Sequence, residues 1–250
     1  WSDDIWVVDS GSHDKTVDIA KEAGANVVMR HFDSYSAQRN ASLQQPFRHD
    51  WVLILDADER VPLKLTHEMH NFLPHANSEV VAARFRRRDY FSNKWLKHAQ
   101  LSPFYIRLVR PDRVHYERQV NEILVVDGLV ADLKEHFDHF PFSKGMSHWI
   151  DRHNRYSSME AETALNERLH SSQFSWKKAL LATDFNERRR HQKGIFYRLP
   201  ARPWIKLFYM LFVRRAVLDG WAGVHYSFLQ AIYEYVITLK EREYLGKKRV

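Results

Sequence analysis

The sequence predicts an α/β fold in which a mostly parallel, Rossmann-like sheet precedes a helical extension. A strand, a helix and a second strand follow one another within the first thirty residues. A run of five apolar residues at 51–55 then ends in two aspartates, and helical spacing of apolar residues begins at 146. We therefore expect a sheet-containing domain over residues 1–145 and a helical extension over 146–250.

The first elements of the sheet surround a turn rich in Ser, Gly and Asp. Ile5–Asp9 is expected to form a buried strand, and Val17–Ala23 a helix that Asp14 or Thr16 caps. Ala25–Met29 is expected to form the next strand, which completes the βα repeat of a parallel sheet. Since the opening strand resembles the second strand of a nucleotide-binding unit, we expect a first strand that is missing before residue 1.

The apolar run Trp51–Leu55 has the length of a buried strand and follows a short helix expected around Ser36–Gln44. It ends in Asp56 and Asp58, which places two carboxylates at the carboxyl edge of the sheet, where open α/β folds bind ligands. Hard oxygen ligands at that edge suit a divalent cation that also holds phosphates. An isolated D-x-D is a weak signal, because many strand-to-loop junctions carry acids.

Alternation and helical spacing predict the remaining elements. They are a helix at Pro62–Leu73, strands at Val80–Tyr90, Arg107–Arg110 and Ile123–Val126, helices at Trp149–Leu169 and Phe174–Arg190, a linker at Gly194–Pro203 and a last helical region at Trp204–Glu243.

Composition limits the classes of function. The 250 residues include no cysteine, which excludes disulfides, zinc–thiolate sites and a cysteine nucleophile. The formal net charge of +7 predicts attraction to nucleic acid, anionic membranes or phosphorylated small molecules. No apolar run has the ~20 residues that a membrane-spanning helix needs.

Three motifs in the first sixty residues resemble those of one enzyme family. They are D-x-G-S-x-D-x-T at 9–16, S-x-x-x-Q-R-N at 34–40 and D-x-D at 56–58. Together they resemble the inverting family 2 glycosyltransferases with a GT-A fold, and most closely the lipopolysaccharide-core β-glucosyltransferases of bacteria. The resemblance extends to L-D-G-W-A-G at 218–223 and implies that residues 1–145 are a GT-A catalytic domain.

The resemblance assigns roles that the chemistry of a nucleotide-sugar donor also suits. Asp9 and Ser10 are expected to bind the nucleotide, although Asp9 is also a natural turn or cap residue. Arg39 is expected to contact the diphosphate and Asp56 the ribose or a water. Asp58 is expected to hold Mg²⁺ or Mn²⁺, which would stabilise the charge on the leaving phosphate.

Inversion requires a general base for the acceptor hydroxyl, and Glu122 is the candidate. The family places a His-Glu pair here, whereas this chain has Asn121 before the glutamate. A surface glutamate at a strand start is the alternative reading, and Asp89 and Glu117 are weaker candidates for the base.

Several basic residues are candidate contacts for the acceptor or for phosphate. Arg107 and Arg110 match an R-L-x-R segment of the family, but they also suit a solvated strand edge. His98 lies in a loop that can line the acceptor pocket. His136 and His139 have metal-ligand spacing, but we expect one to be hydrogen-bonded in the core and the other to lie at the site rim.

Aromatic and basic residues alternate over the last fifty residues, from Trp204 to Tyr235. They indicate helices from about residue 203 that lie on an anionic membrane surface, or a helical pair that buries its own aromatic face. With the implied lipid-linked acceptor, they predict a cytoplasmic protein that is peripheral on the inner face of the cytoplasmic membrane.

The sequence therefore predicts an inverting hexosyltransferase that moves glucose or a similar hexose from a nucleotide-diphosphate donor to a cell-envelope glycolipid or lipopolysaccharide core. The alternative is an inactive glycosyltransferase-like binding protein or fragment. A Rossmann oxidoreductase is disfavoured because no G-x-G-x-x-G follows a predicted strand. No nucleic-acid partner is expected, because base-stacking aromatics do not cluster on a basic sheet.

Overall fold

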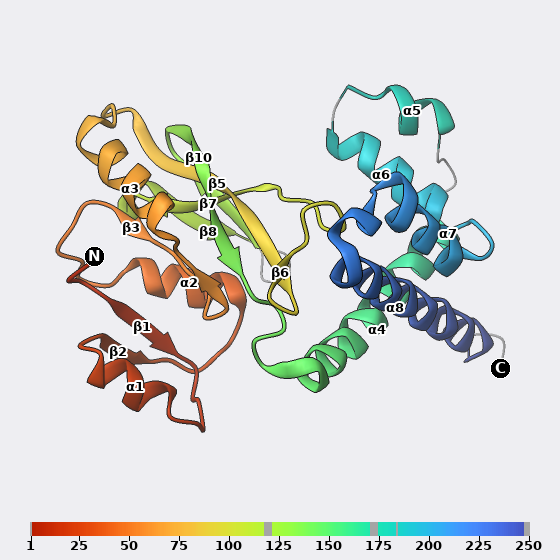
Figure 1. Cartoon of the computed structure of the whole chain (residues 1–250), viewed down its shortest axis with the longest axis horizontal. Coiled ribbons are helices and arrows are strands. Elements are labelled where there is room, and N and C mark those ends of the chain that lie inside the picture. The colour runs from red at the N-terminus through yellow and green to blue at the C-terminus, as the bar shows by residue number, and fades with distance from the viewer. Residues whose placement is uncertain (1, 118–121, 171–174, 184, 248–250) are drawn as a thin grey trace. The chain divides into compact units, whose positions relative to one another are not determined.

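The computed structural model describes residues 2–117, 122–170, 175–183 and 185–247. The chain divides into two compact units, which are considered separately below (Figure 1). Unit 1 consists of Trp1–Arg88 and Ser102–His139, and unit 2 of Asp89–Leu101 and Phe140–Val250. The segment 89–101, which lies within the first domain expected from the sequence, thus packs with the helices of unit 2.

The strands of unit 1 form three sheets in the described residues. They are β1 (Trp6–Asp9), β2 (Asn26–Met29), β3 (Val52–Leu53), β4 (Glu59–Arg60), β5 (Val80–Phe91, which continues into unit 2), β7 (Phe104–Val109), β8 (Val114–Glu117), β9 (Ile123–Val126) and β10 (Leu129–His139). β1 pairs with β2, β8 pairs with β9, and the largest sheet has the order β3-β7-β5-β10-β4. The short strand β6 (Lys94–Trp95) pairs with the end of β5 in unit 2.

The predicted α/β class is confirmed, but the sheets are mixed rather than mostly parallel. β1 and β2 pair in parallel, as their connecting helix α1 (Thr16–Glu22) requires. In the largest sheet, β3 with β7, β5 with β7 and β4 with β10 all pair antiparallel. For β5 and β7, the connection holds no helix, which is the usual crossover between parallel neighbours.

The strand expected over residues 51–55 is shorter than predicted. Only Val52 and Leu53 form ladder pairs, opposite Val109 and Leu108, and the amide of Ile54 donates one further bond to the carbonyl of Arg107 at 2.7 Å. In the described residues β3 has β7 as its strand partner and lies at the edge of the sheet order. The chain leaves the ladder just before Asp56.

The largest sheet is covered on both faces by side chains of other elements. Successive residues of its strands point to opposite faces, so that β5 and β7 each contribute to both clusters. Ala83, Phe85 and Phe137 pack with Leu65 and Met69 of α3 (Leu63–Phe72) on one face. The other face carries a second cluster, which joins α2 (Tyr35–Leu43) to the sheet and to β8 and consists of Leu43, Ala82, Val109, Val114 and Tyr116. α2 therefore lies beside the strands that end near the aspartates.

Unit 2 consists mainly of helices. They are α4 (Gly145–His170), α5 (Trp176–Leu181), α6 (Phe185–Phe196), α7 (Arg202–Phe208), a π-helical turn η3 (Tyr209–Val213), the 3₁₀ turn η4 (Ala216–Asp219) and α8 (Gly220–Lys247). Unit 1 has two further 3₁₀ turns, η1 (Leu73–His75) and η2 (Pro111–Arg113). The single helix expected over 174–190 is two helices, since Ala182 has an extended backbone. The expected linker 194–203 is shorter, because α6 continues to Phe196 and α7 begins at Arg202.

Helix α8 packs against both α4 and α7. Its first turn lies close to η4: a Cβ at Gly223 would be 2.1 Å from the carbonyl oxygen of Ala216, so only glycine fits there. Within the described residues, no helix has the length and apolar character needed to cross a membrane.

Candidate functional site

Helix α2 directs three consecutive side chains to three different segments of unit 1. Gln38 donates to the hydroxyl of Ser10 at 3.1 Å. Asn40 donates to the carbonyl of Tyr116 at 2.8 Å and accepts from the amide of Tyr116 at 2.7 Å. Ser34 caps the helix by accepting from the amide of Ala37. The Q-R-N motif thus fixes α2 between the first turn and β8, and Arg39 lies between these two anchors.

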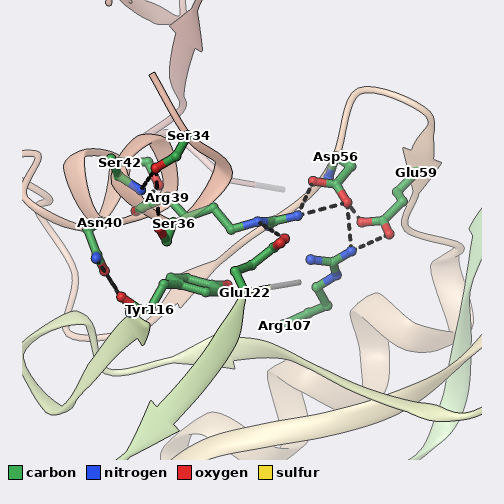
Figure 2. A network of polar contacts seen from close by, with 11 residues as sticks. Ser34, Ser36, Arg39, Asn40, Ser42, Asp56, Glu59, Arg107, Tyr116 and Glu122 are labelled. Carbon is green, nitrogen blue, oxygen red and sulfur yellow. Dashed lines mark hydrogen bonds and ion pairs between the residues drawn. The ribbon is translucent and has the colours of Figure 1, made fainter. Parts of the chain in front are cut away.

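Arg39 joins Asp56 to Glu122, as Figure 2 shows. Its Nη2 lies 2.9 Å and 3.2 Å from the two carboxylate oxygens of Asp56, and its Nε lies 3.3 Å from Oε1 of Glu122. The guanidinium also lies 5.4 Å from the ring centre of Tyr116. The aspartate after β3 and the glutamate before β9 are therefore held on one cation.

A second arginine, Arg107, also pairs with Asp56. Nη2 of Arg107 lies 2.8 Å from Oδ2 of Asp56 and 2.5 Å from Oε1 of Glu59 (Figure 2). Glu59 also accepts from the amide of Asp56 at 3.0 Å. Burial raises the pKa of Glu59. Burial also disfavours the charged form of Arg107, but the carboxylates of Asp56 and Glu59 outweigh this effect and raise the pKa of Arg107.

Exposure increases through this network from the core to the surface. The side chain of Glu59 is 1% exposed, that of Arg107 8% and that of Asp56 41%. We call the set Arg39, Asp56, Glu59, Arg107 and Glu122 the bridged cluster. It has three carboxylates and two guanidinium groups, and its accessible end is formed by Asp56.

Asp58 points to a different partner. Its Oδ2 lies 3.3 Å from Nε2 of His139 at the end of β10, and both side chains are partly buried. Among the residues that the structure describes, no three His, Asp or Glu side chains are grouped closely enough to bind a metal by themselves. Mg²⁺ commonly takes one or two protein carboxylates and completes its shell with phosphates and water. A single carboxylate such as Asp58 fits that mode of binding.

The carboxylate of Asp9 organises its own turn. It accepts from the amides of Gly11 and Ser12 at 2.8 Å and 2.7 Å and from the hydroxyl of Ser12 at 2.5 Å. The hydroxyl of Ser12, followed by the two amides, lowers the pKa of Asp9. These contacts are those of a turn residue, which was one of the two roles expected for Asp9. They fix the backbone on either side of Ser10.

Other predicted contacts lie away from the bridged cluster. Arg110 lies over the ring of Trp51, with its guanidinium carbon 4.9 Å from the ring centre, and 3.7 Å from Asp50. His98 belongs to unit 2, where its Nδ1 lies 2.8 Å from the buried carboxylate of Asp219.

The alternative bases have other surroundings. Asp89 is buried in unit 2, and Glu117 lies exposed beside His115.

Burial lowers the pKa of His136, as expected for a histidine partly inside the core. Asn121 lies outside the described residues.

The comparison with protein families gives a match over most of unit 1. The model of glycosyl transferase family 2 matches residues 2–128, which is half of the chain and includes every member of the bridged cluster. The chain belongs to glycosyl transferase family 2. This family 2 chain therefore carries the bridged cluster and Asp58 within the part that defines its family.

Three curated relatives match parts of this chain. A TPR repeat-containing protein of Synechococcus elongatus is 34% identical over 130 residues, which are 52% of this chain and 30% of the relative. Uncharacterized glycosyltransferases of Rickettsia bellii and Rickettsia conorii are each 36% identical, over 31% and 34% of this chain and over 26% and 30% of their own lengths. The matched segments thus span less than a third of these relatives.

Two residues that contact this candidate site, Glu59 and Tyr116, were not expected from the sequence. Glu59 directly follows the D-x-D motif, so its position was visible, but nothing in the pattern showed that it points into the core. Tyr116 lies on β8, a strand that was not expected from the sequence. Its hydroxyl pKa is raised by burial, and its ring lies beside Arg39.

Proposed function

We propose that this chain is an inverting glycosyltransferase that moves glucose or a similar hexose from a nucleotide-diphosphate donor to a cell-envelope glycolipid or lipopolysaccharide core. The single observation that carries the proposal is the Arg39 bridge between Asp56 and Glu122. It brings a phosphate-binding cation and a carboxylate base together from three segments that are distant in sequence. Membership of family 2 supports the same class of reaction.

Arg39 is the residue we assign to the donor diphosphate. A guanidinium matches two phosphate oxygens at once, and Arg39 already lies in a partly open position beside Asp56. Ser10, which Gln38 holds, and Asp9, which orders the turn, are assigned to the nucleotide. The exposed oxygens of Asp56 are assigned to the ribose or to a bound water.

The charges of the site favour a divalent cation, which family 2 enzymes commonly use. The bridged cluster has one more carboxylate than guanidinium groups, and Asp58 adds another negative charge nearby in sequence. A diphosphate would be repelled by this excess unless a cation accompanied it. Asp58, with His139 beside it, is assigned to Mg²⁺ or Mn²⁺, which would stabilise negative charge on the leaving phosphate.

Glu122 is assigned as the general base. It takes the proton of the acceptor hydroxyl as that oxygen forms a bond to the anomeric carbon. The bond from the anomeric carbon to the diphosphate breaks at the same time, and its electron pair leaves with the nucleoside diphosphate. Arg39 orients the carboxylate of Glu122 and, once it binds the diphosphate, holds the donor beside that base.

The acceptor is assigned to a membrane surface. A glycolipid presents its hydroxyl at the boundary of the bilayer, and the net charge of +7 favours an anionic leaflet. We propose that the protein works on the cytoplasmic side as a peripheral protein. His98, which Asp219 orients, and Arg110 remain candidate contacts for an anionic acceptor. The rival proposal is an inactive relative that binds nucleotide without transfer.

Calorimetric titration with UDP-hexoses and GDP-hexoses, with and without Mg²⁺ or Mn²⁺, tests the donor site. We expect metal-dependent binding of one donor by the wild type and loss of the metal dependence in Asp58→Ala. Asp132→Ala is the control, since Asp132 forms an exposed ion pair with Arg84. Donor binding without metal, equal in wild type and Asp58→Ala, would contradict the assignment of Asp58.

A further inference from the structure

The solvent-facing side of α8 is apolar. Its exposed positions from the start of the helix to residue 239 are spaced alternately by four and three residues, which places them on one face. We call this set the outer stripe of α8: Trp221, His225, Phe228, Ile232, Tyr235 and Leu239. The exposure of its apolar members runs from 44% to 64%, and none of the six is Asp, Glu, Lys or Arg.

The side of α8 that faces the rest of unit 2 is the more polar one. Glu234 and Glu241 are buried there and pair with Arg202 of α7 at 3.2 Å and 2.7 Å. Ser227 is fully buried and donates to the carbonyl of Gly223. Surface helices of globular proteins have the reverse distribution, with apolar residues inside and charges outside. The outer stripe therefore has the character of a covered surface.

Helix α7 and the π-helical turn carry a similar exposed set. Trp204, Phe208 and Phe212 follow one another at intervals of four residues and are 72%, 61% and 59% exposed. The rings of Phe208 and Phe212 lie 5.0 Å apart. Sets of large, exposed apolar side chains such as these are typical of sites that bind another protein or a membrane.

We propose that the outer stripe of α8 lies in the interfacial layer of a membrane that contains anionic lipid. Exposed arginines flank it at both ends, Arg215 before α8 and Arg242 after Leu239, so that both ends suit negatively charged headgroups. Trp and Tyr, which favour the headgroup boundary, lie at positions 221 and 235. The proposal rests on the proposed function only for the lipid-linked nature of the acceptor.

A second copy of the chain fits the stripe less well. Paired helices choose partner and register through charged residues beside their apolar seam. Between residues 221 and 239, the positions beside the outer stripe are instead uncharged, and include Val224, Leu229, Val236 and Thr238. The nearby Lys240 donates to Asn154 and to the hydroxyls of Ser157 and Ser158 on α4, within unit 2.

Sedimentation of the protein with vesicles of phosphatidylcholine, with and without phosphatidylglycerol, tests the proposal. The test variant is Phe228→Gln/Ile232→Gln/Tyr235→Gln, since glutamine keeps helix propensity and removes the apolar side chains. The control is Ile19→Gln/Leu63→Gln/Ile150→Gln, at similarly exposed positions of three other helices. Circular dichroism confirms that each variant is folded.

We expect the wild type and the control to bind vesicles that contain phosphatidylglycerol. The partition coefficient of the test variant should fall by ~100-fold or more. Equal binding by the test variant, or no binding by the wild type, overturns the proposal. A wild-type dimer that the test variant dissociates, without vesicle binding, assigns the stripe to self-association instead. The test variant should bind the donor as the wild type does. Donor binding measured in the same preparations therefore distinguishes a failure of the proposed function from a failure of the membrane proposal.

Discussion

Arg39 and Glu122 form an ion pair, with Nε of the arginine 3.3 Å from a carboxylate oxygen of the glutamate. The same guanidinium binds Asp56 through Nη2. In the proposed reaction the donor diphosphate binds Arg39, which places the donor beside the carboxylate that takes the proton of the acceptor.

Replacement of Arg39 tests its role in donor binding. We expect Arg39→Ala to weaken the affinity for the preferred nucleotide sugar by ~10- to 100-fold, because a charge-assisted, two-point contact is lost. Arg39→Lys should recover only part of this affinity, since an ammonium group cannot present the planar pair of donors. The measurement is a calorimetric titration at fixed Mg²⁺ concentration.

Arg84→Ala is the matched control for Arg39. Arg84 pairs with Asp132 on an exposed part of the sheet, where an ion pair contributes little. Its donor affinity should equal that of the wild type. Equal affinities in Arg39→Ala and in this control would remove Arg39 from the donor site.

The pair of Arg107 and Glu59 is predicted to be a structural support of the site. Arg107→Met should lower the free energy of unfolding by ~3–5 kcal/mol, because Glu59 would remain as a buried, unpaired carboxylate. The double variant Arg107→Met/Glu59→Leu should recover most of this loss, since it removes both charges. Urea denaturation of the three proteins measures the difference, and a double variant less stable than Arg107→Met would contradict the prediction.

The turn at Asp9 predicts a dependence of stability on pH. The hydrogen bonds from Ser12 and Gly11 lower the pKa of Asp9 below its ordinary value of 3.8. The stabilisation is therefore complete above about pH 3.8 and is lost as the pH falls through the lower pKa of the folded state. At neutral pH, Asp9→Asn should destabilise the protein by ~1 kcal/mol.

Denaturation of wild type and Asp9→Asn at neutral and strongly acidic pH checks this sign. The difference between the two proteins should shrink in acid, because the wild-type carboxylate is then protonated. A difference that stays constant or grows in acid would show that the charge of Asp9 does not stabilise the turn. Asp18→Asn, on the exposed surface of α1, is the control.

Local elements of the fold were largely predictable from the sequence, because their signals lie within a few residues. The expected strand at 123–126 is β9, and the expected helices at 36–44 and 62–73 lie within one or two residues of α2 and α3. β10 was missed since its inward positions include Glu135 between Leu133 and Phe137, which hides the alternation of apolar residues. The antiparallel pairings were missed because the βα repeat at the start says nothing about later connections.

The members of the site were predictable as residues but not as a network. Motifs indicated Arg39, Asp56, Asp58 and Glu122 one by one, whereas the shared contacts depend on how α2 lies against the sheet. The same limit applies in unit 2. The Nδ1 of His98 meets the carboxylate of Asp219 across 121 positions of sequence. No local pattern could have paired these two residues.

The rate of transfer by Glu122→Gln decides whether Glu122 is the base of the proposed reaction. The preferred donor, identified by titration, is incubated with Mg²⁺ and a lipopolysaccharide-core acceptor, and glycosylated product and released nucleoside diphosphate are both measured. We expect the variant to bind the donor as the wild type does but to form product ~10²- to 10⁴-fold more slowly, because the acceptor hydroxyl has no base. A variant that forms product as fast as the wild type would contradict the claim that Glu122 is the base of this site.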